Sequence, residues 1–158
     1  MRSSVGALAD ACRAHDHVSV VATDDLSAAV TLVFTQLNGR VERTDDTLAC
    51  TFEVPARATT LHVFPERGVR GALAATRELE LGDAVVDAAF VLRGNDPPLL
   101  VALALELTDL AQAPQLFASI HVAGDKLTVT FESLAVSLLG LAVKHAFAVW
   151  HRVAFFRL

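Results

Sequence analysis

The chain has 158 residues, of which 53% are hydrophobic and 20% are charged, and its formal net charge is −5 at pH 7. This length suits one domain over residues 1–158, and the apolar content excludes a disordered chain and predicts a well-filled core. The basic residues are scattered along the chain, whereas a nucleic-acid groove needs a positive stripe. We therefore expect no nucleic-acid partner.

The first element in chain order is a short amphipathic helix over residues 4–14, with Val5 and Cys12 on one face. Asp10 interrupts its apolar run, so the segment is not typical of a secretory signal. Cys12 and Cys50 lack metal-ligand spacing and suit small buried residues in a reduced cytoplasm, with one disulfide as the alternative. These features predict a cytoplasmic protein.

Two stretches of the sequence match one another. GRVERTDDTLACTFE (39–53) faces ASIHVAGDKLTVTFE (118–132) without a gap, and VSVVATDD (18–25) faces AFVLRGND (89–96). The first pair predicts two β-hairpins, each with an Asp- or Gly-rich turn before a strictly alternating strand. The second pair predicts two strands that end at acidic turns.

Helical segments are expected to follow those acidic turns, at residues 26–37 and 97–111, with Asp25 and Asp96 as their N-caps. The chain is therefore predicted to contain a β-α-β-β unit twice, in halves that span about 17–54 and 88–132, related by a pseudo-twofold axis. The alternative is coincidence, because Thr-Phe-Glu on an alternating strand is common by chance.

The middle of the chain predicts a further strand at residues 59–64. Residues 72–82 are ambiguous between strand and helix, and their alternation favours a strand. Gly82 and Asp83 then form a turn. Loops are expected at Pro55, Pro65 and Gly68.

The segment GDAVVDAAFVLRGND, residues 82–96, resembles a stretch in uncharacterised bacterial proteins of unknown function. In those proteins a Gly-Asp turn leads to an Asp and then to a Phe-containing strand that ends in Gly-x-Asp. The matching residues here are Gly82, Asp83, Asp87, Phe90, Gly94 and Asp96. The resemblance implies a bacterial source and brings no known activity. The same residues also fit a turn, a strand and a helix cap.

The last segment, residues 133–156, predicts a long helix with a narrow polar arc and a wide apolar arc that runs from Val136 to Val153. The polar arc holds Ser137, Gly140, Lys144, His145, His151 and Arg152. Because Lys144 and two histidines lie partway along, the segment is expected to be a core helix lying across a sheet, with a membrane anchor as the alternative. Phe155 is expected to be exposed, where it would mark a partner surface.

Candidate chemistry is sparse. The sequence has no nucleophile motif and no phosphate-binding loop, so no catalytic residue, cofactor or metal is expected. His62 and His121 alternate with apolar neighbours, which predicts that both face outward from the sheet. The enzymatic hypothesis combines these two histidines with a turn carboxylate. Asp24-Asp25 and Asp45-Asp46 are interpreted as turn and cap residues.

Together these elements predict an α+β fold: a mostly antiparallel sheet with helices on one face, closed by the long C-terminal helix. The leading hypothesis is a non-enzymatic binding or interaction module that forms a homo-oligomer, such as a dimer, or binds another protein. The alternative is a carrier of a small apolar ligand in a cavity between the sheet and the C-terminal helix. Phe52, Phe131, Phe147 and Trp150 would line that cavity, or would fill a core instead.

Overall fold

The structure is a computed structural model that describes residues 7–24, 26–66 and 78–156. Its strands are β1 (Val18–Asp24), β2 (Ser27–Leu32), β3 (Leu37–Thr44), β4 (Thr47–Pro65), β5 (Glu78–Leu79), β6 (Phe90–Gly94) and β7 (Ala118–Phe131). Its helices are α1 (Ala7–Arg13), α2 (Ala84–Ala89), α3 (Pro97–Ala102), α4 (Ala104–Ala111) and α5 (Leu139–Phe155), with 3-10 turns η2 (Pro114–Leu116) and η3 (Val136–Leu138).

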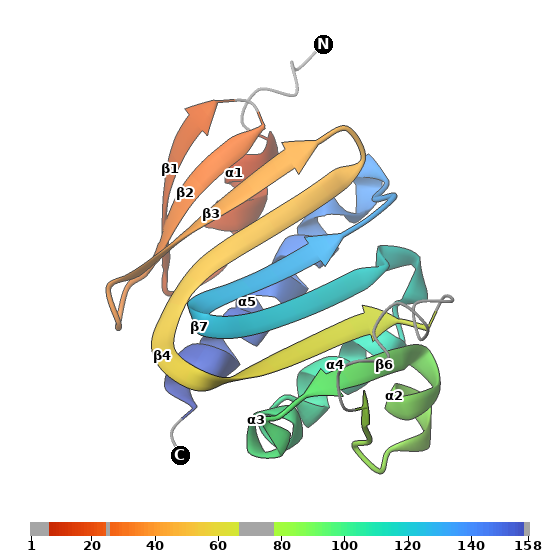
Figure 1. Cartoon of the computed structure of the whole chain (residues 1–158). Coiled ribbons are helices and arrows are strands. Elements are labelled where there is room, and N and C mark those ends of the chain that lie inside the picture. The colour runs from red at the N-terminus through yellow and green to blue at the C-terminus, as the bar shows by residue number, and fades with distance from the viewer. Residues whose placement is uncertain (1–6, 25, 67–77, 157–158) are drawn as a thin grey trace.

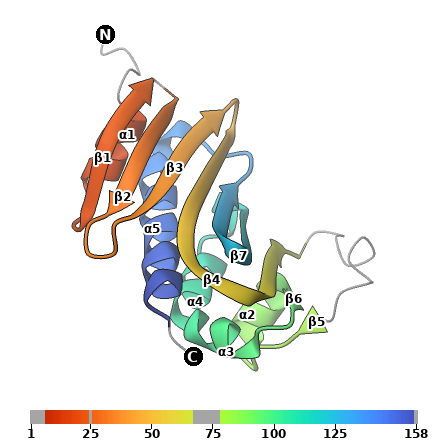
Figure 2. The same ribbon diagram turned by 60° about the vertical axis from the view of Figure 1, so that its left-hand side comes forward.

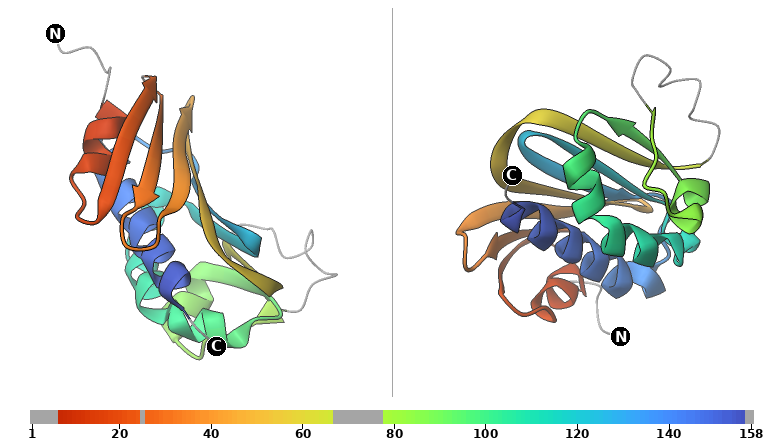
Figure 3. Two further views of the ribbon diagram at one scale, coloured as in Figure 1. Left: turned by 90° about the vertical axis from the view of Figure 1, so that its left-hand side faces the viewer. Right: turned by 90° about the horizontal axis from the view of Figure 1, so that it is seen from below.

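The strands form one seven-stranded sheet in the order β1-β2-β3-β4-β6-β5, with β7 paired to β4. The strand pairs described are antiparallel. α1, α4 and α5 lie against one face, and among the described elements no helix covers the opposite face of β3, β4 and β7 (Figures 1 and 3). We call that opposite face the outer face. The predicted α+β class with a mostly antiparallel sheet and a C-terminal helix is confirmed.

β4 and β7 both bend back on themselves. The register between them shifts at Arg57 and Thr60, where β4 turns, and Figure 2 shows this bend from the side. β7 turns at Gly124, whose φ of 59° suits a tight turn. At the open end of the two arms, the Glu132 N–H donates a hydrogen bond of 3.5 Å to the Phe117 carbonyl. β7 is therefore a hairpin, as predicted for residues 118–132. This hairpin lies inside the bend of β4 (Figure 1).

The two segments that contain Thr-Phe-Glu, one in β4 and one at the end of β7, are neighbours in this sheet. Their paired positions are Leu48 with Phe131, Cys50 with Val129, and Phe52 with Leu127, and all six side chains are at most 1% exposed. Two adjacent strands with one buried face need the same alternation. The recurrence of the pattern therefore follows from strand pairing and does not require a duplication.

The predicted helix at residues 26–37 is wrong. Residues 27–32 form β2, which pairs with β1 on one side and β3 on the other, and a tight turn follows with Gln36 at φ 58°. Its β-branched Val30 and Thr31 favour a strand, and pairing on both sides decides the outcome. The half over 17–54 is thus all strand, while the half over 88–132 contains α3 and α4, so the structure does not confirm the duplication.

The predicted helix at residues 97–111 is present as α3 and α4, which meet at Leu103. Asp96 caps α3 as expected, because its side chain accepts a hydrogen bond from Leu99 N–H. The C-terminal helix begins later than predicted. Ser133 has a φ of 51°, η3 follows, and Val136, expected on the buried arc, is 69% exposed because it lies in this turn.

Some smaller features differ from the predictions, and other predictions fall outside the described residues. α2 was not predicted, and it forms because the Asp83 side chain accepts from the N–H groups of Val85 and Val86. The loops expected at Pro55 and Pro65 are wrong, because Pro55 lies within the bend of β4 and Pro65 is the last residue of β4, paired with Phe90. Of the strand expected for residues 72–82, residues 78–79 form β5, whereas residues 80–82 are not strand. Residues 72–77 and the expectations for Val5, Asp25 and Gly68 lie outside the described residues.

The core lies between the sheet and the helices, and it contains both cysteines. Cys12 and Cys50 are free and buried, so the disulfide alternative is wrong. Burial raises the pKa of the Cys12 thiol to about 12 and raises that of Cys50 as well. Both are inert apolar fillers at neutral pH. None of the helices in the described part of the chain is long and apolar enough to cross a membrane.

Candidate functional site

The four aromatic residues that were predicted to line a ligand cavity lie between the sheet and α5. Phe52 stacks on Trp150 with ring centroids 4.4 Å apart, and Phe147 contacts both rings at 6.0 and 6.3 Å. Trp150 Nε1 donates to the Glu53 carbonyl at 2.9 Å. These three side chains and Phe131 are at most 6% exposed and pack as core. Their role as ligand contacts stays a prediction.

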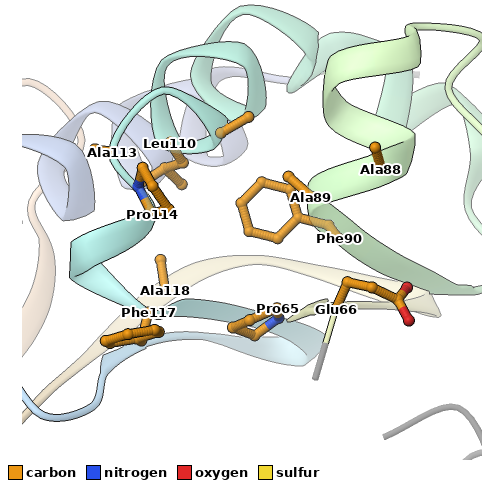
Figure 4. A pocket seen from close by; sticks show the side chains of 11 residues that line it. Pro65, Glu66, Ala88, Ala89, Phe90, Leu110, Ala113, Pro114, Phe117 and Ala118 are labelled. Atoms are coloured by element: carbon orange, nitrogen blue, oxygen red, sulfur yellow. The ribbon is translucent and has the colours of Figure 1, made fainter. Parts of the chain in front are cut away.

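An apolar pocket of about 220 Å³ lies at another place, where the far ends of β4 and β7 meet α2 and α4 (Figure 4). We call it the end pocket. The residues that line it are Pro65, Glu66, Ala88, Ala89, Phe90, Leu110, Ala111, Ala113, Pro114, Phe117 and Ala118. All of them except Glu66 are apolar.

Local sequence explains why this space stays open. Alanines on α2 and around the end of α4 give it short walls, and Phe90 projects between the helices and the strands (Figure 4). Phe117 has a φ of 46°, a left-handed conformation that bulky residues rarely adopt, and it brings its ring to the edge of the pocket. A Glu66 N–H to Ala89 carbonyl hydrogen bond of 2.9 Å joins the end of β4 to the end of α2.

The lining of the end pocket is almost entirely apolar. Among the described residues, neither a histidine nor a cysteine lines it, and the one carboxylate, Glu66, lies at its margin. Small-molecule sites are mostly apolar, and a dry 150 Å³ cavity is enough to hold benzene. A pocket of about 220 Å³ therefore accepts a single ring or a short alkyl segment, while the rest of a larger ligand would stay outside.

The two histidines singled out in the sequence come together on the outer face. His62 and His121 are direct partners across β4 and β7, and their rings meet edge to face with centroids 3.8 Å apart. His62 is half-buried and His121 is exposed, as expected for outward-facing positions. Burial lowers the pKa of both imidazoles, and His121 lowers that of His62 further. On the other side of His62 its strand partner is Arg93.

The segment of residues 82–96 forms a compact structural unit. Gly82 has a φ of 85°, and the Asp87 carboxylate accepts hydrogen bonds from Leu81 and Gly82 N–H at 2.9 and 3.0 Å. Asp83 caps α2, and Phe90 is 6% exposed. The polar residues of this motif thus hold the backbone of the turn and of the first helical residues.

Asp96, the last residue of that segment, is the centre of a buried polar cluster. One carboxylate oxygen accepts from Arg57 Nε and Nη2, at 2.9 and 2.6 Å, and from the Thr59 hydroxyl. The other accepts from Leu99 N–H at 3.2 Å. Arg57 lies over the Phe156 ring, 4.9 Å from its centroid. The cluster joins the bend of β4 to α3 and to the end of α5.

Sequence reasoning found the histidine pair and the cap at Asp96, but it missed the end pocket. The only signal available was the recurrence of alanine next to proline near residues 111–114, together with Ala88 and Ala89. These stretches meet only after α2, α4 and the ends of two strands have packed together. Local sequence patterns do not predict which of these segments pack together.

Comparison with known proteins gives one fold relationship. No protein-family model and no curated protein matches the sequence. Among solved structures, the chain is similar to the crystal structure of the mycobacterial trehalose monomycolate transport factor A, TtfA. The TM-score is 0.52, the sequence identity is 7%, and the match covers 96% of each chain. At this identity the likeness shows a shared fold and nothing more specific.

Proposed function

We propose that this chain is a non-enzymatic binding module that holds the apolar part of a ligand in the end pocket. The observation that supports this most directly is the lining: ten of its eleven residues are apolar, and the walls are made of small side chains. Burying apolar ligand surface there yields roughly 25 cal/mol per Å². Among the described lining residues, Glu66 at the margin carries the one ionisable side chain.

The neighbour TtfA is named as a transport factor for trehalose monomycolate. A shared fold does not carry a function with it. It is nevertheless consistent with a carrier of an apolar ligand, which was the alternative hypothesis from the sequence. The site proposed here is the end pocket, and not the space under α5 that Trp150 and its neighbours fill.

A pair of variants on one helix tests this function. Ala88 is exposed on α2 and lines the pocket, and Ala84 is exposed on the same helix but does not line it. A fluorescence titration with the neutral apolar dye N-phenyl-1-naphthylamine is expected to show binding to the wild type and to Ala84→Phe. Ala88→Phe should bind at least about fivefold more weakly, because the new ring occupies the pocket.

Equal affinity of the dye for both variants, or no binding to the wild type, would contradict the function. A native mass spectrum of protein purified from its own host gives an independent measurement. A mass excess that disappears on denaturation is expected if the pocket carries a ligand in the cell.

A second candidate function is association with another protein, most simply a second copy of this chain. Phe155 is 44% exposed, as expected from the sequence. Together with Phe156 it lines two further pockets, one of about 370 Å³ shared with Leu37 and Pro55 and one of about 270 Å³ shared with Ala102 and His151. Sedimentation velocity is expected to show a dimer that Phe155→Asp dissociates. A wild-type monomer at high concentration would remove this candidate.

The enzymatic hypothesis has less support. It requires a carboxylate beside His62 and His121, and the strand partner of His62 on β6 is Arg93. The cytoplasmic location and the bacterial source remain proposals. We also propose that residues 82–96 form the same turn-and-cap unit in the bacterial proteins that they resemble.

A further inference from the structure

His62 and His121 are held side by side by the pairing of β4 with β7. His62 lies in an arm of β4 that pairs with β6 on one side and with β7 on the other, so its backbone position is fixed from both sides. His121 is its direct partner on β7. The Phe64 ring meets the His62 ring edge to face at 5.4 Å and limits its rotation.

The geometry suits joint coordination of one ion. Late transition metals bind histidine nitrogen at about 2.0–2.1 Å, which places two nitrogens of one site about 3 Å apart. The ring centroids are 3.8 Å apart, a separation that allows one nitrogen of each imidazole to bind the same ion. This face is not covered by a helix in the described part of the chain (Figure 1), and His121 is exposed while His62 is half-buried.

We infer that His62 and His121 form a binding site for a divalent late transition-metal ion, with Cu²⁺ held most tightly. Imidazole suits copper, nickel and zinc. Among these divalent ions the affinity of a given nitrogen site is highest for Cu²⁺. Mg²⁺ and Ca²⁺ prefer oxygen ligands and are not expected to bind. Among the described residues no group of three or more His, Cys, Asp or Glu side chains is placed to hold a metal. Water or ligand atoms complete the coordination.

The surroundings of the pair reduce its affinity for a cation. Arg93, the β6 partner of His62, brings a positive charge beside the site and weakens cation binding. The site is therefore expected to be labile.

Isothermal titration calorimetry with CuCl₂ in a non-chelating buffer at pH 7.5 tests this site. His62→Gln and His121→Gln are each expected to weaken Cu²⁺ binding at least about tenfold. His17→Gln is the matched control, because His15 and His17 are the other closely spaced histidines in the sequence, and it should leave the affinity unchanged. MgCl₂ should give no binding heat.

An unchanged affinity in His62→Gln or His121→Gln, or an equal loss in His17→Gln, would overturn the inference. A measurement on the wild type keeps the test valid if a variant fails to fold. On addition of substoichiometric Cu²⁺, the imidazole NMR signals of His62 and His121 should broaden first. Selective broadening of other histidines would equally overturn the assignment. Neither result depends on a ligand in the end pocket.

Discussion

Asp96 shows how one buried side chain fixes the geometry of the sheet bend. The residue is 3% exposed and binds Arg57, Thr59 and the Leu99 amide at once. Burial alone would raise the pKa of its carboxyl group, but the hydrogen bonds from Thr59, Arg57 and Leu99 and the charge of Arg57 together lower it. The ionised form is therefore part of the folded state.

Asp96→Asn is expected to reduce the free energy of unfolding by about 3 kcal/mol, because it leaves the buried charge of Arg57 without its counter-charge. Urea denaturation at pH 7 measures this. Asp10→Asn, which breaks an exposed ion pair with Arg13, is the control and should cost less than about 1 kcal/mol. Similar losses in the two variants would show that the Asp96 cluster does not stabilise the bend.

Gly94 is the last residue of β6 and pairs with Leu61 of β4. Its φ is 135°, and a Cβ atom there would lie 2.3 Å from the Thr60 carbonyl oxygen. Gly94→Ala is expected to destabilise the protein by about 2 kcal/mol or more, through strain and the displacement of β4. Gly140→Ala on α5 meets no atom within 4 Å and should be neutral or stabilising by up to about 1 kcal/mol. Thermal denaturation distinguishes the two results.

At the level of elements, α5 is anchored to the sheet by the aromatic contacts of Trp150. The indole is fully buried, stacks on Phe52 and donates to the Glu53 carbonyl. Trp150→Ala is expected to cost about 3–5 kcal/mol. Phe155→Ala on the exposed side of α5 should cost less than about 1 kcal/mol. A small loss in Trp150→Ala would instead indicate a loosely filled space under α5, as the carrier hypothesis from the sequence required.

The elements also show what local patterns can predict. The helices at 97–111 and at the C-terminus have caps or a long apolar arc, and both are present. β2 has an apolar run of the same length as a short helix, and only its pairing with β1 and β3 makes it a strand. The resemblance between the Thr-Phe-Glu segments of β4 and β7 predicted their alternation correctly but not that they would be neighbours.

For the molecule as a whole, four histidines predict a sensitivity to acid. Burial is the largest cause that lowers the pKa values of His15, His62, His121 and His145 below 6.5. The unfolded chain then binds more protons than the folded chain below that pH, so stability is complete above about pH 6.5 and falls as the pH decreases. The urea midpoint should be lower at pH 5.5 than at 7.5. An equal or higher midpoint at pH 5.5 would contradict this.

The candidate site was less predictable than the fold. The outward histidines followed from alternation along two strands, but their contact depended on a pairing between residues 59 positions apart. The end pocket depends on four segments that meet at the end of the sheet, and alanine carries no signal of a binding site. The predicted aromatic residues were correctly placed between sheet and helix, where their size fills the space.

The measurement that tests the proposed binding function most directly is an NMR titration of the ¹⁵N-labelled protein with N-phenyl-1-naphthylamine. The shift changes are expected to concentrate at Ala88, Ala89, Ala111 and Phe117, around the end pocket. Changes centred instead on α5 near Trp150 would return the ligand site to the space under that helix. Uniformly unperturbed spectra at saturating dye would contradict the account of this protein as a module that binds apolar ligands.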